Sequence, residues 1–362
     1  MKNHALKRNI IAAIILTALL VIFNIVKHNT QIISFYTQNI SSPLAAFIGA
    51  ACGLLPFSVA EVVWTAFVIF AVLYIIFAVI KIVKSKGKRG YAVLQKLSGM
   101  CVIALSVATG FTALWGVNYY AETFEQKSGL VDSPISVEQL ADVTRLFATK
   151  LNDAALSVNR DENGVCASDV DAMLKASKDL YAPLEEEYPF LQTPHRAAKP
   201  MVYSQLMSAI NYTGFYFPFT GEANINVAQP NAYIGATIAH EQAHLRGVAQ
   251  EQTANFLAIL ACEKTEDVNF RYSGAILAYT HLTNALYSAD YKQWLEVANS
   301  LCDEVNLDLT VNSAYWQQRN TSVSAAANTV YEGFLKSYDQ KQGLKSYGEV
   351  VDLLVEYYAM QA

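Results

Sequence analysis

Charge is scarce in this chain, and acidic charge is almost missing from its first third. Charged residues make up 16% of the 362 residues, against about a quarter in typical soluble proteins. Ten Lys or Arg residues and one acid, Glu61, precede Tyr119, whereas the remainder holds 16 bases and 30 acids. An acidic remainder argues against nucleic acid as a partner, because nucleic-acid binding needs a basic face.

The chain also lacks paired metal-type cysteines, internal repeats and low-complexity tracts. Hydrophobic residues reach 53%, which excludes a disordered chain and a disulfide miniprotein. No two cysteines have a CxxC spacing, so a cysteine-based zinc site is not expected. We expect no disulfide, and we expect Cys52 and Cys101, which lie in apolar stretches, to be buried as small hydrophobes.

Three long apolar stretches predict membrane-spanning helices at residues 9–26, 62–83 and 97–120. A helix needs roughly 20 apolar residues to cross about 30 Å of hydrocarbon, and core helices of soluble proteins rarely lack charge over such lengths. Residues 40–57 are also apolar but are interrupted by Pro and Gly. We expect them to lie at the interface or to form a re-entrant segment, so residues 1–120 form a three-span membrane region.

Basic residues predict the orientation of the spans. Lys2, Lys7 and Arg8 precede the first span, and six further bases lie at the end of the second span or before the third. The positive-inside rule then places the N-terminus in the cytoplasm and residues 121–362 outside it. The first stretch resembles a signal peptide, but it lacks a small-residue cleavage site, which favours an uncleaved anchor. Glu61 is expected to be a solvated interfacial acid.

From about residue 121 the composition is that of a water-soluble domain. Apolar residues at helical spacing predict a helix over 137–156 and another over 168–181, which Pro183 ends or kinks. Aromatic and β-branched residues among Gly and Pro predict short strands and turns over 199–229. From Asn231 the pattern is helical nearly to the end. The expected fold class is mainly α: three transmembrane helices, then a mostly helical α+β domain with a small sheet.

The helix that begins near Asn231 contains His240-Glu241-Gln242-Ala243-His244, an HExxH pattern. Residues four apart lie about 40° apart around a helix, so both imidazoles can face one Zn²⁺ ion. Glu241 flanks the ion and can accept a proton from a zinc-bound water and pass it to a leaving amine. By chance, such a pattern occurs in roughly one in a hundred chains of this length. The alternative interpretation is therefore an ordinary helix whose histidines are solvated or buried in the core.

The residues that follow the pattern supply a third ligand. Gly247 permits a sharp turn at positive φ, after which Glu251 can return to the histidines and complete a His2Glu site. Asn255, one helical turn later, can accept a hydrogen bond from a ligand imidazole and fix its tautomer. Glu263 is the reserve candidate for the third ligand.

The segment HEQAHLRGVAQEQTANF resembles the helix of the gluzincin zinc metalloproteases, which carry HExxH and a downstream glutamate followed by Asn or Asp. With three N-terminal spans and a closing KSYGEVVDLL segment, the chain resembles an uncharacterised family of bacterial membrane proteins known only as a domain of unknown function. This resemblance implies a membrane-anchored, peptidase-like protein with a zincin-like domain. The chain departs from metzincins, which have a third histidine where Gln250 stands, and from thermolysin-like enzymes, whose glutamate falls near Lys264.

Zincins also have an edge strand above the metal that pairs with extended substrate. The resemblance offers the run TGEANIN for this role, and a plain structural hairpin is the equal alternative. A group that stabilises the oxyanion is needed as well, and four residues without diagnostic spacing are candidates: Tyr279, His281, Tyr287 and Arg246.

Two function classes remain. One is a zinc-dependent metallopeptidase, anchored in the lipid bilayer, which hydrolyses a peptide or protein substrate by Glu-assisted attack of a zinc-bound water. The other is a non-catalytic, membrane-anchored zinc-site protein that binds a cell-envelope partner. Glu241 favours the first, because a pure binding site needs no general base. An intramembrane protease is excluded because His240 lies about 120 residues after the last span.

Overall fold

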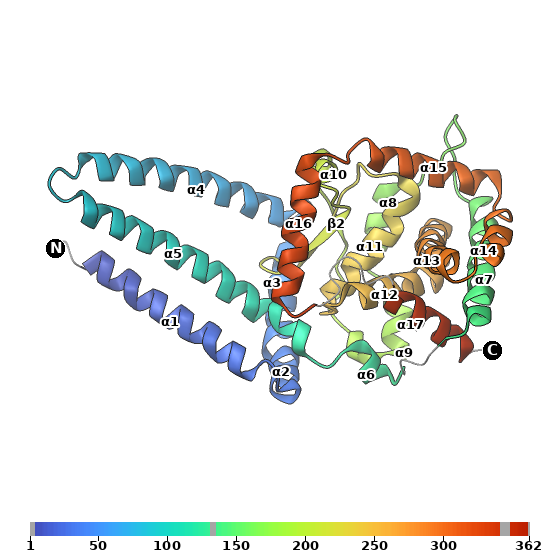
Figure 1. Cartoon of the computed structure of the whole chain (residues 1–362), viewed down its shortest axis with the longest axis horizontal. Coiled ribbons are helices and arrows are strands. Elements are labelled where there is room, and N and C mark those ends of the chain that lie inside the picture. The colour runs from blue at the N-terminus through green and yellow to red at the C-terminus, as the bar shows by residue number, and fades with distance from the viewer. Residues whose placement is uncertain (1–3, 131–134, 341–347, 361–362) are drawn as a thin grey trace.

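The computed structural model describes residues 4–130, 135–340 and 348–360. Three long helices project from one side of a mainly helical body (Figure 1). They are α1 (His4–Val26), α4 (Val59–Lys84) and α5 (Arg89–Leu114), and each is long and apolar enough to cross a membrane. Their apolar side chains are largely exposed, as expected of surfaces that lipid covers. Among the described residues, the number of helices fit to cross a membrane is the predicted three, although the third helix begins at Arg89 and ends at Leu114.

The start of α1 and the turn between α4 and α5 lie at the same end of the three helices, far from the body (Figure 1). Lys7 and Arg8 therefore share one end with the basic turn that holds Lys84, Lys86 and Lys88. The two basic clusters lie together and the body lies opposite, which is the arrangement that three spans require.

The chain between the first two long helices does not span. It forms α2 (Thr30–Tyr36), a π-helical turn η1 (Thr37–Ser41) and α3 (Ser42–Gly53). These three pieces are continuous, and their 24 residues extend about 36 Å, but they run crosswise to the three long helices at the ends nearest the body (Figure 1). Gly49 of α3 lies against Gly221 in the body, where a Cβ on Gly49 would come within 2.8 Å of the Gly221 carbonyl oxygen. The helix thus packs closely under the body.

The body is built around α11 (Asn231–Leu245), whose side chains are buried on nearly all sides. Helices α12 (Glu251–Glu263) and α13 (Val268–Ala289) pack against it, and α7 (Val137–Ala155) and α17 (Gly348–Ala359) pack on these in turn. The further elements of the body are η2 (Gly116–Tyr120), α6 (Phe124–Ser128), α8 (Val170–Ala176), α9 (Ala182–Glu187), η3 (Pro189–Leu191), α10 (Ser204–Ala209), α14 (Tyr291–Ala298), α15 (Asp303–Gln317) and α16 (Ser322–Ser337).

The predicted helix over 137–156 is confirmed as α7, which Ser136 and Gln139 begin with a reciprocal capping box. The prediction over 168–181 was wrong in extent, because the helix there, α8, already ends at Ala176. Pro183 lies instead in the first turn of α9, where its missing N–H costs nothing and its fixed φ suits the helix.

A three-stranded sheet lies beside α11. It consists of β1 (Lys199–Pro200), β2 (Gly214–Phe217) and β3 (Glu222–Ile225), in the order β1-β3-β2. β3 pairs in parallel with β1 and antiparallel with β2. The run TGEANIN therefore contains the middle strand and pairs with β2 as a hairpin, which was one of the two equal alternatives; the other, an edge strand, was wrong. The edge strand next to α11 is β2.

Two buried carboxylates join the body to the start of α4. Glu222 of β3 accepts hydrogen bonds from the backbone N–H groups of Val59 and Ala60 (3.3 and 2.9 Å) and pairs with Lys199 at 2.6 Å. Glu61 of α4 accepts in return from the N–H groups of Val202 and Tyr203 (3.0 and 2.7 Å). Glu61 is buried, so the expectation of a solvated acid was wrong.

The five cysteines are all free, as expected. The expectation that Cys52 and Cys101 are buried was wrong, since Cys101 is exposed on α5 and Cys52 is half-buried. Cys101 lies on a helix that is apolar enough to cross a membrane, and lipid around such a helix would satisfy the same preference for apolar surroundings.

Candidate metal centre

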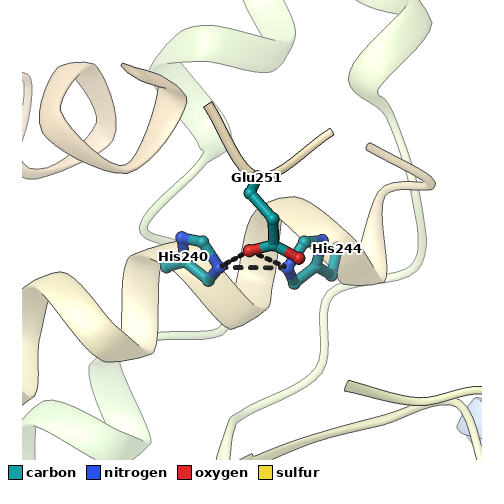
Figure 2. Close-up of side chains that lie close together, drawn as sticks. All are labelled: His240, His244 and Glu251. Carbon is teal, nitrogen blue, oxygen red and sulfur yellow. Dashed lines mark hydrogen bonds and ion pairs between the residues drawn. The ribbon is translucent and has the colours of Figure 1, made fainter. Parts of the chain in front are cut away.

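Three side chains from two consecutive helices converge on one point (Figure 2). His240 Nε2 lies 3.0 Å from His244 Nε2, and Glu251 Oε2 lies 3.2 Å from the first nitrogen and 3.7 Å from the second. Donor atoms bound at about 2.0–2.2 Å to one tetrahedral zinc lie roughly 3.3–3.5 Å apart. The spacing and the nitrogen and oxygen donors therefore fit a metal ion, and these residues form a His-His-Glu group that could hold one.

The local chain explains the convergence. His240 and His244 lie one turn apart on α11, which ends at Leu245. Gly247 then adopts a φ of 84°, a conformation that favours glycine, and the chain reverses so that Glu251 becomes the first residue of α12. The sequence predicted both features: the positive-φ turn at Gly247 and the return of Glu251 to the two histidines.

Hydrogen bonds orient both imidazoles. His240 Nδ1 lies 2.8 Å from Asn255 Oδ1, and His244 Nδ1 lies 2.7 Å from the Val248 carbonyl oxygen. A carbonyl oxygen only accepts, so Nδ1 carries the proton and Nε2 of a neutral ring keeps a lone pair for a metal. The predicted contact of Asn255 with a ligand imidazole is present, and Val248 provides a second one that the sequence did not indicate.

Electrostatics draw the three groups together. Burial opposes charge on Glu251, but the two adjacent histidines outweigh it and hold the pKa of this carboxyl well below its usual range. Burial likewise lowers the pKa of His244, but the carboxylate of Glu251 prevails and raises it to about 9. A metal ion that binds here replaces a proton.

Glu241 lies beside the ligands in a cavity of about 560 Å³. It is buried, and the backbone of Tyr216 in β2 favours its charged form by lowering the pKa of this carboxyl. Its Oε2 atom has no hydrogen-bond partner among the described residues. Gly214 allows this approach, because a Cβ there would lie 2.9 Å from Glu241 Cγ and Oε1. Burial raises the pKa of Glu241, although His240 and His244 oppose that change.

Aromatic side chains form much of the remaining cavity wall. Phe111, Trp115 and Tyr119 come from the end of α5 and from η2, and Tyr331 and Phe334 come from α16. The hydroxyl of Tyr331 donates to Glu251 Oε1 at 2.8 Å. This tyrosine lies 80 residues after Glu251 and no local motif marks it, so sequence reasoning missed it.

The expected oxyanion candidates are placed elsewhere. Tyr279, His281, Tyr287 and Arg246 are not among the described residues that line this cavity. Tyr287 is exposed, and Arg246 pairs with Glu185 at 2.7 Å. Burial lowers the pKa of His281 to about 4, so this side chain is neutral at pH 7.

Glu263, the reserve ligand, is also elsewhere. It pairs with Lys150 and accepts a hydrogen bond from the hydroxyl of Tyr358, at the opposite end of α12 from Glu251. Helix α12 therefore brings Glu251 and not Glu263 to the histidines.

Fold and site together define a mainly helical protein with three helices fit to cross a membrane and a His-His-Glu group fit to hold a metal ion. The chain belongs to the family described as "Protein of unknown function (DUF3810)", whose family model matches residues 36–355. Neither a curated protein nor a solved structure matches the chain.

Proposed function

We propose that the protein is a membrane-anchored zinc metallopeptidase in which His240, His244 and Glu251 hold Zn²⁺. One observation carries this proposal: Glu241 places a buried carboxylate in the same cavity as the three converging ligand atoms, with one oxygen unpartnered among the described residues. An unpartnered buried carboxylate is costly. A site that only binds a cell-envelope partner does not need one, so catalysis is favoured over that alternative.

Each polar group then has a role. Bound zinc supplies a Lewis acid that polarises a peptide carbonyl and lowers the pKa of water. Glu241 accepts a proton from the attacking water and returns it to the leaving nitrogen, while the water oxygen joins the carbonyl carbon and the C–N bond breaks. Tyr331, whose hydroxyl lies within hydrogen-bond distance of Glu251, is the candidate donor to the substrate oxygen.

Strand β2 is suited to hold an extended substrate. The N–H of Asn226 donates to the carbonyl of Thr213 at 2.9 Å, and backbone groups alternate in direction along an antiparallel strand. Gly214 and Tyr216 therefore direct their backbone groups away from β3, toward the cavity that they line. Main-chain pairing with such an edge accepts many sequences.

We further propose that residues 1–120 anchor residues 121–362 outside the cytoplasm. The basic clusters at the far end of the three helices support this orientation. A reporter that is active only in the cytoplasm, fused after Ala362, should stay silent.

The test uses the full chain in detergent. Wild type and Glu263→Ala should hold one zinc per chain, whereas His244→Ala and Glu251→Ala should lose it. Glu241→Gln should keep zinc and fold but cleave a mixed peptide library at least about 10²-fold more slowly, because it keeps the side-chain volume and loses the base. If wild type holds zinc and cleaves nothing, or if the Gln variant cleaves as fast as wild type, the proposal is wrong.

A further inference from the structure

The edge strand β2 connects the candidate catalytic carboxylate to the apolar helices. At its first residue, Gly214 lies against Glu241. At its other end, the ring of Phe217 lies 6.2 Å from that of Trp64 in α4. In the turn that follows, the ring of Phe219 packs against Gly110 of α5. A Cβ on Gly110 would lie 3.0 Å from this ring. One end of the strand is thus at the site of chemistry and the other at two candidate membrane spans.

The wall of the cavity also comes from one of these spans. Phe111 lies in the last turn of α5, and Trp115 directly follows that helix. The Trp115 ring lies 4.8 Å from that of Tyr216 in β2 and 5.6 Å from the imidazole of the metal-ligand candidate His244. Aromatic residues at the end of a span mark the membrane–water interface, so this cavity lies at the level of that interface.

Exposed apolar side chains on the body lie at the same level. Val202 is 84% exposed and Leu206 63% exposed, next to the first turn of α4, where Glu61 bonds the N–H of Val202. Outside the body, Leu54, which directly follows α3, is 85% exposed. Large apolar side chains clustered beside the mouth of a span are suited to contact lipid, so the body lies directly on the membrane surface.

We propose that the substrate is a membrane-anchored polypeptide that is cleaved in the segment adjoining its own membrane span, at a site with a large apolar side chain. This inference rests on the proposed function. A strand advances about 3.3 Å per residue, so a chain paired along the four residues of β2 reaches the apolar helices after roughly 13 Å. The cleaved bond would lie within about ten residues of the membrane.

The probe is a single polypeptide with an Ala/Leu-rich span followed by five tandem copies of the six-residue sequence that the wild-type protein cleaves fastest in the peptide library. Every copy has the same sequence, so only the distance from the membrane varies. The full-length protein and the probe are reconstituted together in phospholipid vesicles, and mass spectrometry locates the cuts. A soluble peptide with the same five copies is the control.

We expect at least about tenfold more cutting in the two copies nearest the span than in the two most distant, and no such gradient in the soluble peptide. Equal cutting of all copies in vesicles, or preferential cutting of the distant ones, overturns the inference and leaves the peptidase proposal standing. If the library and both probes remain intact, the proposed function fails and the inference fails with it.

A pair of variants tests the apolar wall. Phe111→Ala enlarges the cavity and should shift the preferred side chain at the cleavage site toward larger residues by roughly tenfold, the scale of apolar pocket discrimination. Val107→Ala removes a side chain one turn earlier on α5 that is exposed, so its preferences should match wild type. Zinc content, measured for both, should not change. An unchanged preference in Phe111→Ala with zinc retained contradicts the assignment of this wall as a substrate pocket.

Discussion

Gly214→Ala is a sharp test of the proposed catalytic geometry, because it adds one methyl group at the point where β2 meets Glu241. The new Cβ would lie 2.9 Å from Glu241 Cγ and Oε1 and 3.0 Å from Thr237 Cγ2. Ordinary contacts of a Cβ are 3.4–4 Å, so the carboxylate or the strand must retreat by about 0.5–1 Å. Either movement displaces the Glu241 carboxylate within the cavity that it shares with the metal-ligand candidates.

A displacement of about 1 Å in a catalytic group can cost about 10²-fold in rate, equivalent to about 2.7 kcal/mol of transition-state stabilisation. We expect kcat/KM on the best library peptide to fall by about that factor. The metal ligands lie on α11 and α12 and not on the strand, so zinc content should stay at one per chain. Added bulk in a packed site typically costs 1–3 kcal/mol of stability, which leaves the variant folded at assay temperature.

Gly90→Ala is the matched control, since a Cβ on Gly90 would meet no atom within 4 Å and Gly90 lies at the far end of α5 from the cavity. Its activity and zinc content should equal those of wild type. If Gly214→Ala keeps more than about a third of wild-type kcat/KM, the contact between β2 and Glu241 does not position the base. If it loses zinc, the strand supports the ligands and the division of roles proposed here is wrong.

Two further predictions concern stability. Asp308 is 1% exposed and binds Arg160, the Tyr272 hydroxyl and the Cys166 N–H. Asp308→Asn should lower the free energy of unfolding by about 3–5 kcal/mol, measured as a lower Tm. The control Asp303→Asn changes an exposed residue and should change Tm little. Glu185 and Asp179 raise the pKa of His195, so its contribution is present below its unfolded pKa of about 6.5 and is lost as pH rises through the folded value. His195→Gln should therefore lower Tm at pH 5.5 and match wild type at pH 9; an equal loss at both would contradict this reasoning.

Local signals in the sequence account for the elements that were predicted well. The lengths of the apolar runs are sufficient for three spans, whereas the segment from α2 to α3 differs from them by its Pro and Gly residues and by its crosswise placement (Figure 1). HExxH, Gly247 and Glu251 lie within 12 residues of one another, so helix geometry and one positive-φ glycine are enough to bring them together. Asn255 follows from the same helix, one turn after Glu251.

Contacts between distant segments were not predictable in this way. Tyr331 of α16 contacts Glu251, and Trp115, between α5 and η2, contacts His244. No spacing rule connects these positions. The order of the strands also depends on β1, a two-residue strand that carries almost no periodic signal. The sequence consequently left the edge strand and the plain hairpin as equal alternatives for the run TGEANIN.

Glu61 shows that the change from apolar to ordinary composition near residue 120 does not separate two independent structural units. Its charge at the mouth of an apolar stretch suggests contact with water, yet it binds two backbone N–H groups of the body, while Glu222 of the body binds two at the start of α4. Each carboxylate replaces water at backbone groups of the other part, so removal of either part takes the two N–H partners away from the carboxylate of the other. Because β3, which holds Glu222, also pairs with β2, the interlock that fixes α4 also fixes the strand that contacts Glu241. The membrane helices are thereby part of the framework that positions the candidate catalytic group.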